Sequence, residues 1–276
     1  MEEDEALERF EQFERFERMS SSRSTASLRS TTIACCLNFM SLKAVFFDAA
    51  GTLIKTIRPV GESYARLAQK YGVEASPEEI RERFRSCFAA APPLAFPGAE
   101  AGDIKALERQ WWKELVRRIF EPYGEFPGFD GYFSELFGYF SRPDAWMLYP
   151  ETAETLSLLR ERGFILDVIS NFDSRLLAIL DGLGISSGFD SVVISSRVGY
   201  AKPAPEIFHA ALGLHGLKAE EALHVGDSLD KDAAGASRAG LTGVLLDRSG
   251  KGASNSFPRA RSLREIVPLV ERINAL

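Results

Sequence analysis

The chain of 276 residues has a formal net charge of −6, with 45% hydrophobic and 26% charged residues, which is typical of one large globular domain with an insertion or of two domains. No block rich in Lys and Arg accompanies an aromatic platform, which argues against a nucleic-acid or membrane-surface partner, and no apolar run approaches the roughly 20 residues of a transmembrane helix. The three cysteines form neither a disulfide framework nor a zinc spacing, so we expect a soluble, cytoplasmic protein that binds a small molecule.

Residues 1–39 differ in amino-acid composition from the rest of the chain. An acidic stretch, MEEDEALERFEQFERFERM, is followed by SSSRSTASLRSTT, which has hydroxyls and Arg but no acid. Early acidic residues are unusual in a targeting presequence, and we expect disorder here. Because Met40 directly precedes the first patterned segment, our hypothesis is that translation naturally starts at Met40. An intact mass of the native protein that includes the leader would contradict it.

From Lys43 onward, short apolar runs rich in β-branched residues alternate with helical patterns. Strands that are buried on both faces have such continuous apolar sequences, and several of the helical segments between them end at a glycine. This alternation predicts the α/β class, with a Rossmann-like, doubly wound parallel sheet. The expected strands are 44–47, 165–170, 191–195, 222–226 and 243–247.

One connection is far longer than a βαβ crossover needs. About a hundred residues separate the first two expected strands, and most of them show helical periodicity with Phe and Trp at three- and four-residue spacings. We predict an inserted helical cap domain at 59–146 and a core domain formed by 40–58 and 147–276. The expected cap helices are 59–72, 76–91, 104–120 and 131–140.

Polar residues follow the expected strands at one edge of the predicted sheet. Asp48 and Asp227 each come directly after a strand, Ser170 and Asn171 close another, and Lys202 lies in a loop beyond a fourth. Each residue alone could be a helix cap or a solvated lysine. Ligands of open α/β sheets bind outside the carboxyl ends of the strands, so this convergence predicts an active site.

The segments FDAAGTL, ISN, KPAPEIF and HVGDSLDKD resemble, in order and spacing, the four motifs of the haloacid dehalogenase (HAD) superfamily. The helical insert is similar to the C1-type cap of subfamily IA, and SNFDSRLL with KPAPEIF resembles the branch of the rhythmically expressed gene product. The resemblance covers about residues 42–250. It implies a Mg²⁺-dependent, phosphatase-like hydrolase that acts on a small phosphorylated metabolite.

The resemblance also assigns metal ligands. A carboxylate that attacks phosphorus forms an acyl phosphate, and Asp48 would be this nucleophile. Mg²⁺ prefers oxygen ligands and would supply the countercharge, with Asp48 and Asp227 as side-chain ligands and the backbone carbonyl of Ala50 as the third ligand that the family implies. Asp232 could bind a metal water or hold Lys202, although an acid in the first turn of a helix can also serve the helix dipole alone.

The remaining candidates would bind the phosphate. Ser170, the amides near it and Asn171 can bind the transferring oxygens, and Lys202 can neutralise charge on them and on the nucleophile. Gly51 and Thr52 form the turn after the first strand, where a small residue lets the backbone approach phosphate.

Ala50 departs from the phosphatase pattern, in which this position is a second Asp that protonates the leaving oxygen and later activates water. Losing such acid–base help typically costs about 10²- to 10⁴-fold in rate. One group of relatives without this acid is the 2-haloacid dehalogenases, which need no metal. Another is the phosphonoacetaldehyde hydrolases, which use a lysine of the cap. Here Lys70, Lys105 or Lys113 would have to take that role. A phosphate-binding or regulatory module without efficient turnover is a further alternative.

Overall fold

The computed structural model describes residues 41–250 and 256–275, so the predictions for residues 1–39 and for a start at Met40 lie outside the described residues. Its centre is a six-stranded sheet in the order β5-β4-β1-β6-β7-β8. Every pairing in this sheet is parallel, which confirms the predicted fold class. The strands are β1 (Ala44–Phe47), β4 (Ile165–Ser170), β5 (Ser191–Ile194), β6 (Ala222–Gly226), β7 (Thr242–Leu246) and β8 (Arg259–Ala260).

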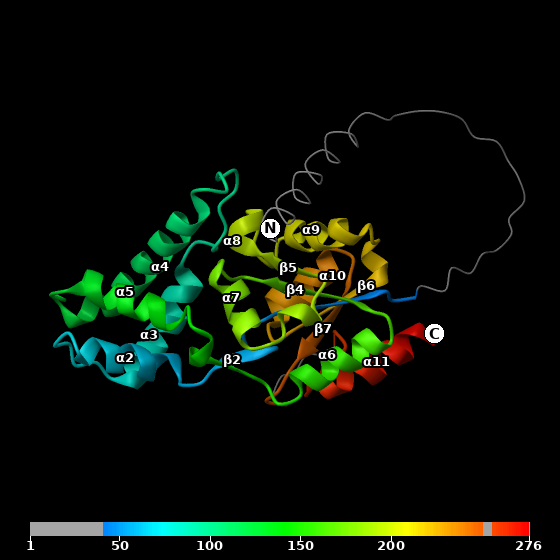
Figure 1. Cartoon of the computed structure of the whole chain (residues 1–276), viewed down its shortest axis with the longest axis horizontal. Helices are drawn as coiled ribbons and strands as arrows, with labels where there is room; N and C mark the ends of the chain where they lie inside the picture. The colour runs from blue at the N-terminus through cyan, green and yellow to red at the C-terminus, as the bar shows by residue number, and fades with distance from the viewer. Residues whose placement is uncertain (1–40, 251–255, 276) are drawn as a thin grey trace, which may run out of the picture.

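Helices cover both faces of this sheet (Figure 1). Val45 and Phe47 of β1 pack in one hydrophobic cluster and Phe46 packs in a second, because successive side chains of a strand point to opposite faces. Both faces are therefore buried, as the continuous apolar strands predict. The first cluster includes α6 (Thr152–Glu161), α7 (Arg175–Gly182) and α11 (Ile266–Asn274), and the second includes α9 (Pro205–His215) and α10 (Gly235–Arg238).

A group of helices, here called the helical insertion, lies to one side of the sheet (Figure 1). It begins after β2 (Ile54–Thr56) and ends before β3 (Trp146–Leu148), and these two strands form an antiparallel pair. The insertion has a hydrophobic cluster of its own, rich in aromatic side chains. The domain boundaries at 59 and 146 stay a prediction. The helices are α2 (Val60–Gln69), α3 (Pro77–Ala90), α4 (Ile104–Phe120) and α5 (Phe129–Tyr139), with the short turns η1 (Glu121–Tyr123) and η2 (Pro143–Ala145).

Some local details differ from the sequence expectations. The strand expected at 191–195 ends one residue earlier, because Ser195 begins the short helix α8 (Ser195–Val198). The helical pattern after Asp227 starts as a π-helical turn, η5 (Leu229–Ala234), in which the amides of both Asp232 and Ala233 donate to the Ser228 carbonyl. Three further turns are η3 (Ser186–Gly188), η4 (Ala219–Glu221) and η6 (Leu263–Glu265). Within the described residues, none of the helices combines the length and apolarity that crossing a bilayer requires.

Candidate active site

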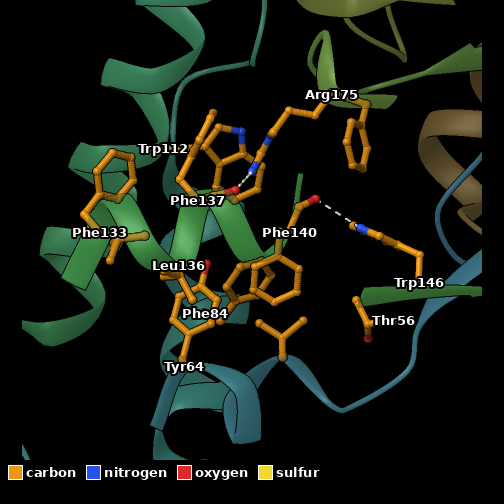
Figure 2. Close-up of a pocket in the computed structure, with 13 residues that line it drawn as sticks. Thr56, Tyr64, Phe84, Trp112, Phe133, Leu136, Phe137, Phe140, Trp146 and Arg175 are labelled. Carbon is orange, nitrogen blue, oxygen red and sulfur yellow. Dashed lines mark hydrogen bonds between the residues drawn. The ribbon is translucent and has the colours of Figure 1, made fainter. Parts of the chain in front are cut away.

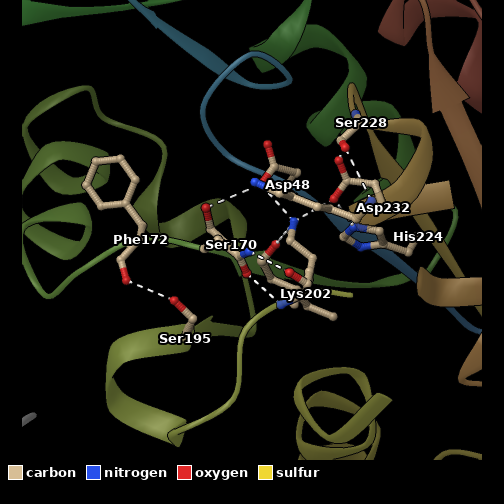
Figure 3. A network of polar contacts seen from close by, with 11 residues as sticks. Asp48, Ser170, Phe172, Ser195, Lys202, His224, Ser228 and Asp232 are labelled. Atoms are coloured by element: carbon tan, nitrogen blue, oxygen red, sulfur yellow. Dashed lines mark hydrogen bonds and ion pairs between the residues drawn. The ribbon is translucent and has the colours of Figure 1, made fainter. Parts of the chain in front are cut away.

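Asp48 lies at the centre of a polar network at the carboxyl end of the sheet (Figure 3). It directly follows β1, and only 8% of its surface is exposed. Its Oδ1 accepts hydrogen bonds from Lys202 Nζ at 2.8 Å and from Ser170 Oγ at 3.3 Å. Because β4 is the neighbour of β1 in the sheet, Ser170, the last residue of β4, reaches Asp48 directly. The structure thus brings together three of the residues that the sequence singled out.

Lys202 is sealed in the protein, with 3% of its surface exposed. Its ammonium donates to Asp48, to Asp232 Oδ1 at 2.6 Å and to the Ile169 carbonyl at 2.7 Å. Burial alone would lower the pKa of Lys202, but the charges of Asp232 and Asp48 outweigh it and hold this pKa above its usual value. Lys202 is therefore a permanently charged group beside the candidate nucleophile.

The side chain of Asn171 holds the loop that carries Lys202. Its Oδ1 accepts from the Lys202 backbone N–H at 2.7 Å, and its Nδ2 donates to the Lys202 carbonyl at 2.8 Å. Both polar ends of the Asn171 amide are thus committed to the protein. The Asn171 side chain therefore sets the position of Lys202, and its contact with phosphate stays a prediction.

Asp232 is fixed on both of its oxygens. Oδ1 contacts Lys202 and lies 3.0 Å from His224 Nε2, and Oδ2 accepts from the Ser228 backbone N–H at 2.9 Å. Burial alone would raise the pKa of Asp232, but Lys202 and His224 outweigh it and hold this pKa below its usual range. Burial lowers the pKa of His224, so the imidazole is neutral at pH 7. Of the roles predicted for Asp232, these contacts favour the one of holding Lys202.

Three carboxylates offer oxygens to a common point. One oxygen from each of Asp48, Asp227 and Asp232 lies within 4.8 Å of the others. Asp227 is exposed, but partial desolvation of its carboxylate, followed by the charges of Asp48 and Asp232, raises its pKa to about 6. Lys202 is the ammonium in this group and balances one of the carboxylates, which leaves an excess of negative charge. This donor set and charge balance fit a hard divalent cation such as Mg²⁺.

The turn after β1 packs tightly against Asp227. Gly51 has a φ of +96°, and a Cβ atom at this position would lie 2.3 Å from Asp227 Oδ2. Glycine is therefore required both by the backbone conformation and by the close approach. Thr52 is fully buried, so the structure gives its hydroxyl no route to a phosphate. Ala50 is exposed beside this turn.

An aromatic cavity of about 80 Å³ lies where the helical insertion meets the core (Figure 2). The Arg175 guanidinium stacks on the Phe137 ring at 3.9 Å and pairs with Asp173 at 2.6 Å. Arg175 is therefore already neutralised by the protein. The lining residues are Thr56, Val60, Tyr64, Phe84, Trp112, Val116, Phe133, Leu136, Phe137, Phe140, Trp146, Phe172 and Arg175.

Sequence reasoning missed a buried carboxylate, Glu108 of α4, that ties the insertion to the core. It is 3% exposed. Its Oε1 accepts from the Ser174 N–H at 2.9 Å, the Ser174 hydroxyl at 2.8 Å and the Ser196 hydroxyl at 2.6 Å. The only signal in the sequence was an acid within an otherwise amphipathic helix, which does not reveal its partners.

Comparisons with known proteins point to a single family. The model of the haloacid dehalogenase-like hydrolase family matches residues 42–240. The haloacid dehalogenase-like hydrolase domain-containing protein 3 of Mus musculus is 35% identical over 83% of this chain and 88% of its own length. The phosphoserine phosphatase of Thermus thermophilus is 32% identical over 75% of this chain and 89% of its own length.

Solved structures show the same likeness. A HAD phosphatase from Thermococcus onnurineus superposes with a TM-score of 0.59 at 26% identity, over 83% of this chain and 98% of its own. A dehalogenase gives a TM-score of 0.63 at 25% identity, over 83% of this chain and 97% of its own.

Proposed function

Because the chain belongs to the haloacid dehalogenase-like hydrolases, we propose that this hydrolase cleaves a small phosphorylated metabolite with the help of Mg²⁺. The carboxylate of Asp48 is the nucleophile, and the reaction passes through an aspartyl phosphate. The observation that carries the proposal is the pairing of Asp48 with the buried ammonium of Lys202 at 2.8 Å, beside a carboxylate cluster with excess negative charge. The likeness to the phosphoserine phosphatase of Thermus thermophilus supports it.

The reaction balances in two displacements. An Asp48 carboxylate oxygen forms a bond to phosphorus while the bond to the leaving oxygen breaks, and water then cleaves the acyl phosphate to release phosphate and restore Asp48. Lys202 and the Ser170 hydroxyl stabilise negative charge next to the nucleophile. Asp48, Asp227 and the Ala50 carbonyl would hold Mg²⁺, which would supply the countercharge that two approaching anions need.

Ala50 limits which substrates the site can process. Its methyl group cannot protonate a leaving oxygen, a loss that typically costs about 10²- to 10⁴-fold in rate. Acyl and aryl phosphates have leaving groups that need little protonation. We therefore assign phosphate esters or anhydrides with good leaving groups as the substrate class, and alkyl phosphates as poor substrates.

Specific observations weigh against the alternatives. Dehalogenation needs no metal, whereas here Asp48, Asp227 and Asp232 each offer an oxygen within 4.8 Å of the others, a donor set that suits a divalent cation. A phosphonatase needs a lysine that faces the substrate, but Lys70 is 54% exposed and pairs with Glu135. Lys113 pairs with Asp130, and Lys105 is exposed. A phosphate-binding module is favoured by Ala50 alone.

The test is hydrolysis of an aryl phosphate, acetyl phosphate, an alkyl phosphate and a 2-haloacid by the wild type and by Ala50→Asp, with and without Mg²⁺. We expect Mg²⁺-dependent turnover of the activated phosphates by the wild type. The exposed position of Ala50 leaves room for a carboxylate. The rate of alkyl phosphate hydrolysis should therefore rise by about 10²-fold or more in Ala50→Asp. No turnover by either protein, with Mg²⁺ bound, would favour the binding module instead.

A further inference from the structure

Arg248, which follows β7, forms hydrogen bonds with the turn at residues 50–52, just after the candidate nucleophile. Its Nη2 donates to the Thr52 carbonyl at 2.8 Å, and its Nε donates to the Gly51 carbonyl at 3.4 Å. Its Nη1 donates to Glu151 Oε1 at 2.5 Å. The guanidinium also lies over the Tyr149 ring, 3.6 Å from its centroid. One side chain from the loop after β7, two strands from β1 in the sheet, thus fixes two successive carbonyls of this turn.

The opposite side of the same turn faces the carboxylate cluster. Gly51 is so close to Asp227 that a Cβ would lie 2.3 Å from its Oδ2. The turn is therefore held between the guanidinium of Arg248 and the carboxylate of Asp227. A small shift of the turn would change the distance between the Ala50 carbonyl and the carboxylates, because the backbone of residues 50–52 is continuous.

The anchor of Arg248 is itself well fixed. Glu151 is 7% exposed and also accepts a hydrogen bond from the Ser262 hydroxyl at 3.3 Å. Burial alone would raise the pKa of Glu151, but the hydrogen bond and charge of Arg248 hold this pKa below its usual value. Glu151 therefore stays ionised, and its charge keeps the guanidinium in place.

We propose that Arg248 is a positioning residue, which holds the turn 50–52 in the shape that lets the Ala50 carbonyl and the carboxylates of Asp48 and Asp227 bind one Mg²⁺ ion. The inference rests on the proposed function. Arg248 acts through the backbone, since its hydrogen bonds go to two carbonyls and to Glu151. The planar fork of arginine reaches these acceptors together, whereas the single ammonium of a lysine does not.

The experiment compares Arg248→Lys with the wild type by calorimetric titration of the full-length protein with MgCl₂ alone. Partners that orient metal ligands typically change metal affinity by about 10- to 100-fold, so we expect at least about a 10-fold weaker Mg²⁺ affinity in Arg248→Lys. This variant keeps the charge that Glu151 needs. The control is Arg162→Gln, because Arg162 also bonds one carboxylate, Glu271, and one carbonyl, that of Leu158. The control should bind Mg²⁺ as the wild type does.

A second variant separates positioning from stability. The single variant Arg248→Gln leaves the buried carboxylate of Glu151 without its partner, which should lower the melting temperature. The double variant Arg248→Gln with Glu151→Gln removes that carboxylate, so its melting temperature should be higher than that of Arg248→Gln. Its Mg²⁺ affinity should stay at least about 10-fold weak, because the grip on the turn is still lost. If the double variant or Arg248→Lys binds Mg²⁺ as tightly as the wild type, the inference is overturned.

The outcomes also distinguish this inference from the proposed function. A wild type that binds Mg²⁺ but hydrolyses no phosphate would remove the proposed function and leave the calorimetric comparison intact. Phosphatase activity together with unchanged Mg²⁺ affinity in the variants would remove only the role of Arg248. A wild type that binds no Mg²⁺ would overturn both.

Discussion

Trp112 donates its indole N–H to the Asp173 carboxylate at 2.6 Å, and this bond joins helix α4 of the insertion to the loop after β4. Asp173 is fully buried and also pairs with Arg175 at 2.6 Å. Glu108, one turn earlier on α4, bonds the next residue of the same loop. The helical insertion is therefore hydrogen-bonded to Asp173 and Ser174. These residues lie three and four positions after Ser170, which contacts the candidate nucleophile.

Glu108→Gln should weaken this junction. The amide oxygen of Gln can take the place of Oε1, but it lacks the negative charge that strengthens the three hydrogen bonds this oxygen accepts. We expect the free energy of unfolding in urea to fall by about 1 to 3 kcal/mol. Glu114→Gln on the same helix is the control, since Glu114 is 46% exposed, and it should change stability by less than about 0.5 kcal/mol. Equal effects of the two variants would contradict the role of Glu108.

Asp48→Asn should remove turnover while the fold remains. An amide cannot attack phosphorus, so the rate with an aryl phosphate should fall by more than about 10⁴-fold. The melting temperature should change little, because Lys202 keeps its second partner, Asp232, at 2.6 Å. Asp144→Asn, at a side chain that is 72% exposed, should keep full activity. Wild-type turnover by Asp48→Asn would rule out Asp48 as the nucleophile.

Asp227→Asn should stabilise the protein at pH 7 when Mg²⁺ is absent. The pKa of Asp227 rises from 3.8 to about 6 on folding, so the folded protein retains a proton that the unfolded chain loses between these values. Stability therefore decreases as the pH rises through this window. Because solvent screens this exposed side chain, we expect a gain of only about 1 kcal/mol, which disappears below about pH 4.

Thermal unfolding across this pH range checks the prediction for Asp227. Saturating Mg²⁺ should reverse the order of stability, because only the wild type gains from tight ion binding. Asp230→Asn is the matched control, since Asp230 lies three residues away and is 74% exposed. If Asp227→Asn is less stable than the wild type at pH 7 without Mg²⁺, the ionised Asp227 carboxylate does not destabilise the folded protein.

Lys202→Met should both inactivate and destabilise the protein. It leaves the buried Asp48 and Asp232 facing each other without the ammonium, and breaking a buried pair in this way typically costs about 3–5 kcal/mol. Urea unfolding at pH 7 measures the loss. Lys231→Met, at an exposed lysine of η5, should have less than about 0.5 kcal/mol of effect. A Lys202→Met variant as stable as the wild type would mean that another cation replaces Lys202.

The sequence predicts the central strands of the sheet well, because a strand that is buried on both faces has a continuous apolar sequence. The expected bounds of β1, β4 and β6 agree with the structure to the residue. β8 has only two residues and leaves no pattern. The pairing of β2 with β3 joins segments about ninety residues apart, and short strands do not reveal such partners.

The candidate site divides in the same way. Asp48, Ser170 and Lys202 could be found because each ends a strand, follows one or lies in a loop beyond one, and parallel strands bring those positions together. The sequence left several roles open for Asp232, and its contact with Lys202 favours one of them. Arg248 could not be found, because it acts on backbone carbonyls, and a carbonyl is present at every residue.

The three tryptophans of the chain all lie close to the junction between the helical insertion and the core. Trp112 bonds Asp173, Trp111 packs edge-on against Trp112 with ring centroids 5.1 Å apart, and Trp146 packs on Phe172 at 5.7 Å. Indole emission depends on the polarity and the quenching groups around the ring. The protein therefore carries its own optical reporter, and a change at this junction on addition of Mg²⁺ or phosphate would be read by stopped-flow fluorescence without a label.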